Sequence, residues 1–349
     1  MSTAWFNRAL LPWYHEHKRP LPWRSESDPY RIWLSEVILQ QTRVDQGMAY
    51  WHRFVEGYPT VQHLANATED EVLRLWQGLG YYSRARNLRT AAQQVVERHD
   101  GSFPATYSEL KALQGVGEYT AAAIGSIAFG LAEPVVDGNV YRVLSRVFGL
   151  ATPIDSTLGK KEFRELAGRL LDHTNPGDHN QAVMELGALV CTPKNPSCEA
   201  CPLAAKCIAL RTERIPELPV KTGEQKIRER HFNYLHIRTT TGIYLQKRTA
   251  KDIWQGLYEL PLIESAKALG KERMQVELQR LLGPGWTITA MHGPMKHVLS
   301  HQHLQTKFWE VSPPRKSRLP KTWIAVNAQE MNSYALPRLL DRYLNKAQP

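Results

Sequence analysis

The chain has 349 residues, of which 42% are apolar and 22% charged, so it is long enough for two domains and its composition excludes a disordered protein. Its formal net charge of +10 suits a partner rich in phosphate, although a basic, well-solvated surface has the same composition. The first twenty residues lack the apolar core of a signal peptide, and the longest apolar tract, residues 121–136, is too short and too polar to span a bilayer. We therefore expect a soluble, cytoplasmic protein without membrane attachment.

Two patterns follow each other along the chain. Residues 1–211 predict an all-α domain, because apolar residues recur at three- and four-residue spacing between Gly, Pro and Asn/Asp breaks. Residues 212–230 carry prolines and many charges and predict a linker. Residues 231–349 predict a mixed α+β domain. Its expected elements are a hairpin of 232–238 and 243–248 around a Thr-Thr-Thr-Gly turn, strands at 257–263, 286–291, 303–311 and 323–326, and helices at 271–282 and 333–345.

A Gly-Val-Gly turn separates two predicted helices in the first domain. It consists of Gly115, Val116 and Gly117, after a helical pattern over 107–113 and directly before another. Glycines allow a tight turn and let backbone N–H groups point at an approaching phosphate. The spacing alone equally fits a simple helix–helix corner, but the flanking pattern matches a helix-hairpin-helix DNA-binding element.

A carboxylate is expected in apolar surroundings near the N-terminus. Glu36 lies in a charge-poor helical run from Ile32 to Gln41, where desolvation would raise its pKa towards that of a general acid. A glutamate on a solvated helix face is the alternative interpretation. Gln41 and Thr42 follow and offer an amide and a hydroxyl for contacts with DNA bases.

A second carboxylate, Asp137, directly precedes a helical run. An aspartate there is most simply a helix N-cap. It lies about 20 residues after the Gly-Val-Gly turn, where it would also be placed to face a cation developing on a sugar.

All four cysteines fall within seventeen residues and have the spacing C-x6-C-x2-C-x5-C. Such crowding indicates one metal site rather than a disulfide framework. Four thiolates suit either a tetrahedral zinc ion or an iron–sulfur cluster, and the spacing leaves both open. The candidate ligands are Cys191, Cys198, Cys201 and Cys207.

Together these features resemble the endonuclease III superfamily of DNA glycosylases, and most closely its adenine-specific MutY branch. The segments that show this resemblance occur in the same order as in the family. They are Leu21–Arg24, Ser35–Val44, Gln77–Leu88, Leu113–Ala121, Val135–Val140 and the cysteines. The resemblance implies a helix-hairpin-helix glycosylase domain, a 4Fe-4S cluster on the four cysteines, and a Nudix-like (MutT-like) C-terminal domain. It also implies that the target base is flipped out of the duplex.

The resemblance also assigns roles to the carboxylates. Glu36 would protonate adenine, and Asp137 would stabilise or covalently trap the oxocarbenium-like sugar, with Asn139 orienting Asp137 or the water. Tyr119 occupies the position at which strand-nicking relatives carry a Schiff-base lysine, so a monofunctional enzyme is expected. A bifunctional enzyme acting on oxidised pyrimidines and a non-enzymatic DNA-binding protein are the alternatives.

The remaining expected contacts are with duplex DNA holding adenine opposite 8-oxoguanine or guanine, bound by a monomer. Leu79 and Tyr81 match a duplex-probing loop, and Arg24 matches a segment that approaches the adenine pocket. Ser300 and His301 match the loop that reads 8-oxoguanine, although Leu299 replaces its usual aromatic residue. The metal-binding glutamates of the Nudix box are missing after residue 261, so pyrophosphate hydrolysis is not expected.

Overall fold

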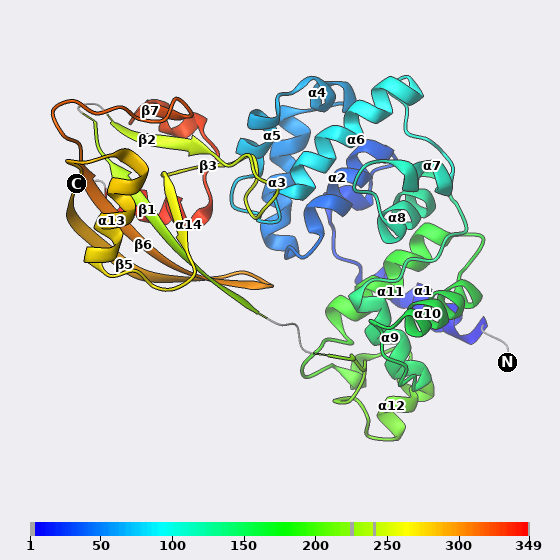
Figure 1. Ribbon diagram of the computed structural model, residues 1–349. Helices are drawn as coiled ribbons and strands as arrows, with labels where there is room; N and C mark the ends of the chain where they lie inside the picture. Colours follow the sequence, from blue (N-terminus) through cyan, green and yellow to red (C-terminus); the bar gives the residue numbers. More distant parts are fainter. Residues whose placement is uncertain (1–3, 224–226, 240–241, 348–349) are drawn as a thin grey trace. The chain divides into compact units, whose positions relative to one another are not determined.

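The computed structural model describes residues 4–223, 227–239 and 242–347 (Figure 1). It divides into two compact units, each treated by itself below. The helical unit comprises residues 1–66 and 87–223, and the mixed unit comprises residues 67–86 and 224–349. None of the helices in the described residues is both long and apolar enough to cross a membrane.

Helices make up almost all regular structure of the helical unit, as its apolar periodicity predicts. Many begin at a recognisable signal: Asp28 and Asp137 cap two helices with their side chains, and Asn175 precedes a proline at the first helical position. The elements are α1 (Ala4–His17), α2 (Pro29–Leu39), α3 (Val44–Gly57), α4 (Val61–Asn66), α6 (Ser83–His99, shared with the mixed unit), α7 (Tyr107–Ala112), α8 (Glu118–Phe129), α9 (Gly138–Phe148), α10 (Thr157–Leu170), α11 (Pro176–Leu189) and α12 (Ile208–Arg211).

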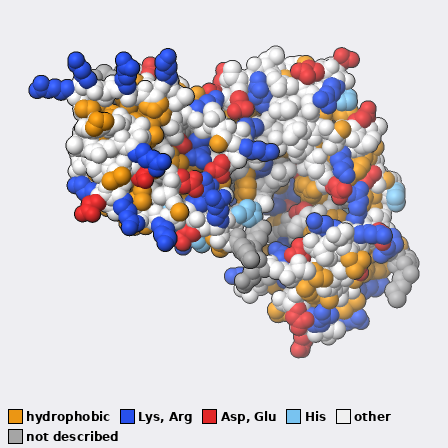
Figure 2. All heavy atoms as spheres, in the orientation of Figure 1, with side chains coloured by type: hydrophobic (Ala, Val, Ile, Leu, Met, Phe, Trp, Pro, Cys, Tyr) orange, Lys and Arg blue, Asp and Glu red, His pale blue; other side chains and the backbone are white. Residues whose placement is uncertain are grey.

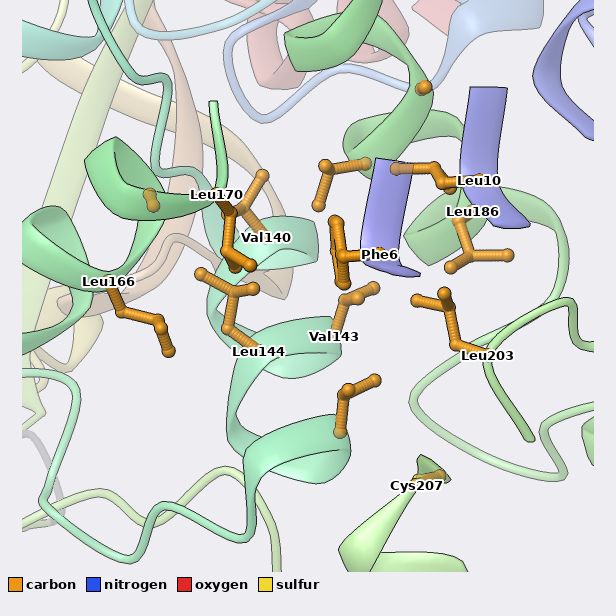
Figure 3. Packing of buried hydrophobic residues seen from close by; sticks show 14 of the residues in the cluster. Phe6, Leu10, Val140, Val143, Leu144, Leu166, Leu170, Leu186, Leu203 and Cys207 are labelled. Atoms are coloured by element: carbon orange, nitrogen blue, oxygen red, sulfur yellow. The ribbon is translucent and has the colours of Figure 1, made fainter. Parts of the chain in front are cut away.

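A core of buried side chains holds α1, α9, α10 and α11 together (Figure 3). Phe6 and Leu10 from α1 meet Val143 and Leu144 from α9, and Leu186 joins them from α11. Cys207 belongs to the same core. The segment that bears the cysteines is therefore anchored to the helices by apolar packing.

The predicted linker is partly packed on the helical unit. Leu218 is buried in its core, and Val220 accepts a backbone hydrogen bond from Ile154. Residues 224–226 lie outside the described part of the chain. The apolar residues within the otherwise charged segment 212–223 explain why it adheres to the helices.

The mixed unit contains two sheets. Its strands are β1 (Arg228–Ile237), β2 (Gly242–Lys247), β3 (Tyr258–Glu259), β4 (Leu262–Ser265), β5 (Thr287–Val298), β6 (Gln302–Ser312) and β7 (Trp323–Asn327), and its helices are α5 (Glu69–Trp76), α13 (Lys271–Leu282) and α14 (Arg338–Ala347). One sheet has the order β4-β1-β6-β5, with β1 parallel to β6, and the other has the order β3-β2-β7.

Side chains of β1 and β6 alternate between the two faces of the four-stranded sheet, and apolar residues on each face pack against a helix. Phe232 and Phe308 pack with α14, whereas Leu235 and Trp309 pack with α13. The predicted helix over 271–282 is confirmed at both ends. The final helix begins at Arg338 rather than 333.

The expected hairpin of 232–238 and 243–248 is wrong in its pairing. Both strands exist, but β1 pairs with β4 and β6, and β2 pairs with β3 and β7. A single bridge between Arg238 and Ile243 links them, and residues 240–241 of the turn lie outside the described residues. The ten-residue parallel register of β1 with β6 is a non-local pairing that local sequence signals do not contain.

Candidate active site and nucleic-acid contacts

Glu36 lies on α2 with only 8% of its surface exposed. Its neighbours Trp33 and Ile32 are buried, so α2 carries the carboxyl into apolar surroundings. Burial raises the pKa of Glu36 to about 7, and the nearby charge of Asp137 adds to the rise. The Tyr119 hydroxyl opposes it, because it donates a hydrogen bond to Glu36 Oε2 at 2.6 Å. A carboxyl with such a pKa can both hold and release a proton near neutral pH.

Asp137 is the N-cap of α9, and both of its carboxylate oxygens accept hydrogen bonds. Its Oδ1 accepts the backbone N–H of Val140 at 2.8 Å, and its Oδ2 accepts Nδ2 of Asn139 at 2.8 Å. Burial raises the pKa of Asp137, while these two hydrogen bonds oppose the rise. The two interpretations of Asp137, as a helix N-cap and as a carboxylate available to a sugar cation, are therefore compatible. The capping hydrogen bond holds the Asp137 carboxyl near Glu36.

Arg142 ties Asn139 to the cysteine segment, and the sequence interpretation missed it. Its Nη2 donates to Asn139 Oδ1 and to the Gly187 carbonyl, each at 2.7 Å, and its Nε donates to the Cys191 carbonyl at 2.6 Å. The available signal was its position three residues after Asn139, on the same helix face.

Two residues of α11 were also missed. Met184 Sδ lies 3.6 Å from the Tyr119 hydroxyl. Gly187 packs against Asn139 so closely that an added Cβ would lie 2.6 Å from Asn139 Cβ. A glycine inside a helix is costly, and that cost was the signal for a close approach.

The Gly-Val-Gly turn joins α7 to α8 as predicted. Gly115 has φ +76°, and a Cβ there would lie 2.6 Å from Asn87 Cβ, so glycine is required. Val116 is buried and anchors the turn. Gly117 is the exposed N-cap of α8, with open space where a Cβ would be, so its backbone is open to a ligand such as phosphate.

Gln41 and Thr42 form the turn between α2 and α3. Gln41 is exposed and has φ 55°, a conformation that costs energy for a residue with a side chain. Thr42 is half-buried, and its backbone N–H donates to Leu39. The turn therefore holds an exposed amide a few residues from Glu36.

Arg24 is engaged within the protein. Its Nη1 and Nη2 donate to the two oxygens of Glu185 at 2.8 and 2.6 Å, and Arg19 binds the same carboxylate. These bonds lower the pKa of Glu185 to about 2 despite its burial. Arg24 therefore fixes its segment to α11, and direct contact with DNA stays a prediction for this side chain.

The four predicted lesion-reading residues come together in the mixed unit. Leu79, Tyr81, Ser300 and His301 line one cavity of about 450 Å³. The hydroxyls of Tyr81 and Ser300 are hydrogen-bonded, and Tyr81 has a left-handed φ of 46°. Leu299 and Trp254 contribute apolar walls to the cavity.

The cysteines share one small cavity but are not packed around a point. Among the described residues, no three His, Cys, Asp or Glu side chains stand close enough to hold a single metal ion. All four cysteines nevertheless line a cavity of about 20 Å³, and Arg146 Nη1 donates to Cys191 Sγ at 3.5 Å.

Comparison with known proteins matches two parts of the chain to families. Residues 34–169 match the HhH-GPD superfamily base excision DNA repair proteins, and residues 233–346 match the NUDIX domain. The adenine DNA glycosylase of Buchnera aphidicola (strain Sg) is 34% identical over 282 residues, which are 79% of this chain and 81% of the relative. The human adenine DNA glycosylase is 48% identical over 213 residues, but these cover 58% of this chain and only 39% of the human protein.

Solved structures support the fold of the helical unit. A thermostable thymine-DNA glycosylase aligns with a TM-score of 0.56 at 28% identity, covering 60% of this chain and 97% of that one. A non-covalent endonuclease III–DNA complex aligns with a TM-score of 0.53 at 21% identity, covering 61% and 98%. The second likeness concerns the fold alone.

Proposed function

The chain belongs to the adenine DNA glycosylase family, and from this premise we propose that it excises adenine paired with 8-oxoguanine or guanine in duplex DNA. It is a base excision repair enzyme, and its substrate is DNA. The observation that carries the proposal is the pair of neighbouring, desolvated carboxyls with different hydrogen-bond partners. Glu36 is desolvated and bound by one hydroxyl, whereas Asp137 accepts two N–H donors.

The proposed reaction divides the work between these carboxyls. Glu36 gives its proton to a ring nitrogen of adenine, so the electron pair of the breaking C–N bond leaves with a neutral base. The positive charge that develops on the sugar is stabilised by Asp137, whose negative form is favoured by Val140 and Asn139. Water then adds to the sugar and loses a proton, and an abasic site remains.

Tyr119 supports a reaction that stops at base removal. A phenol lacks the amine needed for a Schiff base with the sugar. Its hydroxyl is instead bound to Glu36 Oε2, where it holds the acid in place and limits the rise of its pKa. We therefore propose a monofunctional enzyme without strand nicking.

The cavity beside Ser300 is the proposed reader of the oxidised guanine. Hydroxyls and the imidazole of His301 offer donors and acceptors, while Leu299 and Trp254 offer apolar contact with a base. Leu299 cannot stack as an aromatic ring would. Discrimination between 8-oxoguanine and guanine would then come from polar contacts of Ser300 and His301.

A 4Fe-4S cluster is the proposed occupant of the cysteine cavity. The donor set fits, because four thiols line one site and an arginine N–H points at the sulfur of Cys191. Bound there by Cys191, Cys198, Cys201 and Cys207, the cluster would cross-link the segment whose Cys191 carbonyl binds Arg142. A monomeric state and a cytoplasmic location remain predictions.

An alkali-cleavage assay tests the activity. A labelled duplex with adenine opposite 8-oxoguanine is incubated with the protein and then heated in alkali, and a break is expected at the adenine. Duplexes with guanine or cytosine opposite adenine, assayed in the same way, report the mispair preference. No break with cluster-loaded protein would contradict the proposal.

Borohydride trapping tests the restriction to base removal. The proposal expects little covalent adduct with the wild type. Tyr119→Lys supplies an amine at the same position and is the matched positive control, expected to trap the sugar. Efficient trapping of the wild-type chain would overturn the monofunctional assignment.

A further inference from the structure

The net positive charge of the chain comes from its C-terminal part. Residues 1–223 contain 24 Lys and Arg and 24 Asp and Glu, whereas residues 224–349 contain 20 and 10. The whole formal charge of +10 therefore lies in the last 126 residues. Counterion release on binding a duplex scales with the number of cations that meet phosphates, so the surplus cations of the mixed unit favour contact with a phosphate backbone.

The densest cationic segment of this unit is the loop between β6 and β7, residues 313–322, called here the basic loop. Arg315, Lys316, Arg318 and Lys321 are all exposed, and the sequence from 311 to 329 contains no Asp or Glu. Figure 2 shows Lys and Arg side chains projecting along the edge of the mixed unit at the upper left, beside β2 and β7 in Figure 1. The loop also contains three prolines, which restrict it and reduce the entropy lost on binding.

The basic loop lies far from the lesion-reading residues. Ser300 and His301 form the turn between β5 and β6, and the basic loop follows the other end of β6, where Ser312 pairs with Thr287. Figure 1 shows these two ends of the β5–β6 hairpin pointing in opposite directions. Across the 11 residues of β6 the separation is about 33 Å.

We propose that the basic loop binds the phosphate backbone of a second segment of duplex DNA while the β5–β6 turn contacts the lesion duplex. A turn that approaches a base pair carries the far end of its strands away from that duplex. A separation of about 33 Å exceeds the width of the groove or backbone that the turn itself occupies. The surface thus serves transfer between DNA segments and goes beyond the recognition of the mispair.

The test separates a second duplex from the flank of the first. A lesion duplex with about eight base pairs on each side of the mispair extends about 27 Å in each direction. This is less than the distance of about 33 Å between the two ends of β6. The full-length, cluster-loaded chain is saturated with this duplex, which carries a donor dye. An undamaged duplex with an acceptor dye is then titrated at several salt concentrations, and energy transfer reports the ternary complex.

The variant R315S/K316S/R318S removes three cations of the basic loop, and K267S/K271S/R273S removes three exposed cations around α13 as the matched control. We expect the loop variant to weaken second-duplex binding at least about tenfold and to reduce the salt slope by about 3, with the control near wild type. Both should excise adenine from the short duplex at the wild-type rate. An unchanged excision rate would show that any loss of second-duplex binding does not come from a loss of the proposed glycosylase activity.

Three outcomes would overturn the inference. One is the absence of a ternary complex with the wild type, which would leave a solvated basic face or a site for an acidic protein. Another is an equal loss in both variants, which would indicate overall charge alone. The third is a loss seen only when the flanks of the lesion duplex are lengthened, because the loop would then bind the first duplex.

Discussion

The pair of carboxyls and the β5–β6 turn are built on opposite principles. Glu36 is 8% exposed, and Asp137 already accepts its hydrogen bonds within the protein. Ser300 and His301, by contrast, are exposed at the end of a hairpin. The proposed catalytic groups need a desolvated and preorganised setting, which folding alone supplies, whereas the proposed lesion-reading groups must leave donors and acceptors open for a base.

This contrast predicts different penalties for change in the two regions. Loss of a group in the buried pair removes an interaction that water cannot replace. Loss of a group at the exposed turn removes a contact that water partly replaces. Substitutions in the first region should therefore reduce the rate of base release, and those in the second should reduce discrimination between mispairs.

The largest effect is expected for Asp137→Asn. The amide keeps the shape of the side chain and an oxygen for the Val140 N–H, but removes the negative charge that is proposed to stabilise the sugar cation. We expect single-turnover release of adenine to fall about a thousandfold or more. Affinity for the mispaired duplex, measured by fluorescence anisotropy, should stay within a few-fold of the wild type. A parallel loss of affinity would contradict a purely electrostatic role.

The pH dependence of the rate is the next largest effect. Glu36, the proposed acid, has its pKa raised to about 7 by burial, so the rate should fall about tenfold per unit above pH 7. Asp137 is proposed to act in its ionised form and burial raises its pKa, so the rate should also fall on the acid side, where this carboxylate becomes protonated. In Tyr119→Phe the hydrogen bond that lowers this pKa is lost, so the falling limb should move to higher pH. The rate is measured from pH 5 to 9.

Tyr141→Phe is the control for that shift. Its ring packs against Phe163 on α10, and no hydrogen bond from its hydroxyl to Glu36 is found among the described residues. Its pH profile should match that of the wild type. A limb that moves to lower pH in Tyr119→Phe would show that the tyrosine does not stabilise the charged form of Glu36.

The sequence predicted the ingredients of the buried pair better than their connections. The cap position of Asp137, the turn at Gly115 and the helix at 271–282 follow from local rules of capping, left-handed φ and amphipathic spacing. Arg142 was missed because its partners at Gly187 and Cys191 are more than 40 residues away. The hairpin prediction failed for the same reason, since the partner of β1 is β6.

A smaller effect is expected for Gly187→Ala, which tests whether helix packing holds the pair. The added methyl group would meet Asn139 Cβ at 2.6 Å, so Asn139 or α11 must shift, and we expect the hydrogen bond from Asn139 to Asp137 to weaken. A shift that costs one hydrogen bond should slow base release about tenfold, which corresponds to about 1.4 kcal/mol. Gly168→Ala on α10 is the matched control, because its nearest neighbour would be Pro134 Cγ at 3.9 Å. Equal rates in both variants would show that the close approach of α11 to Asn139 is not needed for catalysis.

The smallest effect is expected at the exposed turn, for Ser300→Ala. Removing one hydroxyl from a solvated site should cost about 1 kcal/mol, so the preference for 8-oxoguanine over guanine should fall about fivefold. The rate of base release from the adenine–guanine mispair should be unchanged, because the substitution leaves Glu36 and Asp137 untouched. Ser312→Ala, at the opposite end of β6, should change neither quantity. Competition between the two duplexes for one enzyme measures the preference directly. A loss of rate without loss of preference would mean that this hydroxyl supports the chemistry, and the contrast between the buried pair and the exposed turn would then fail.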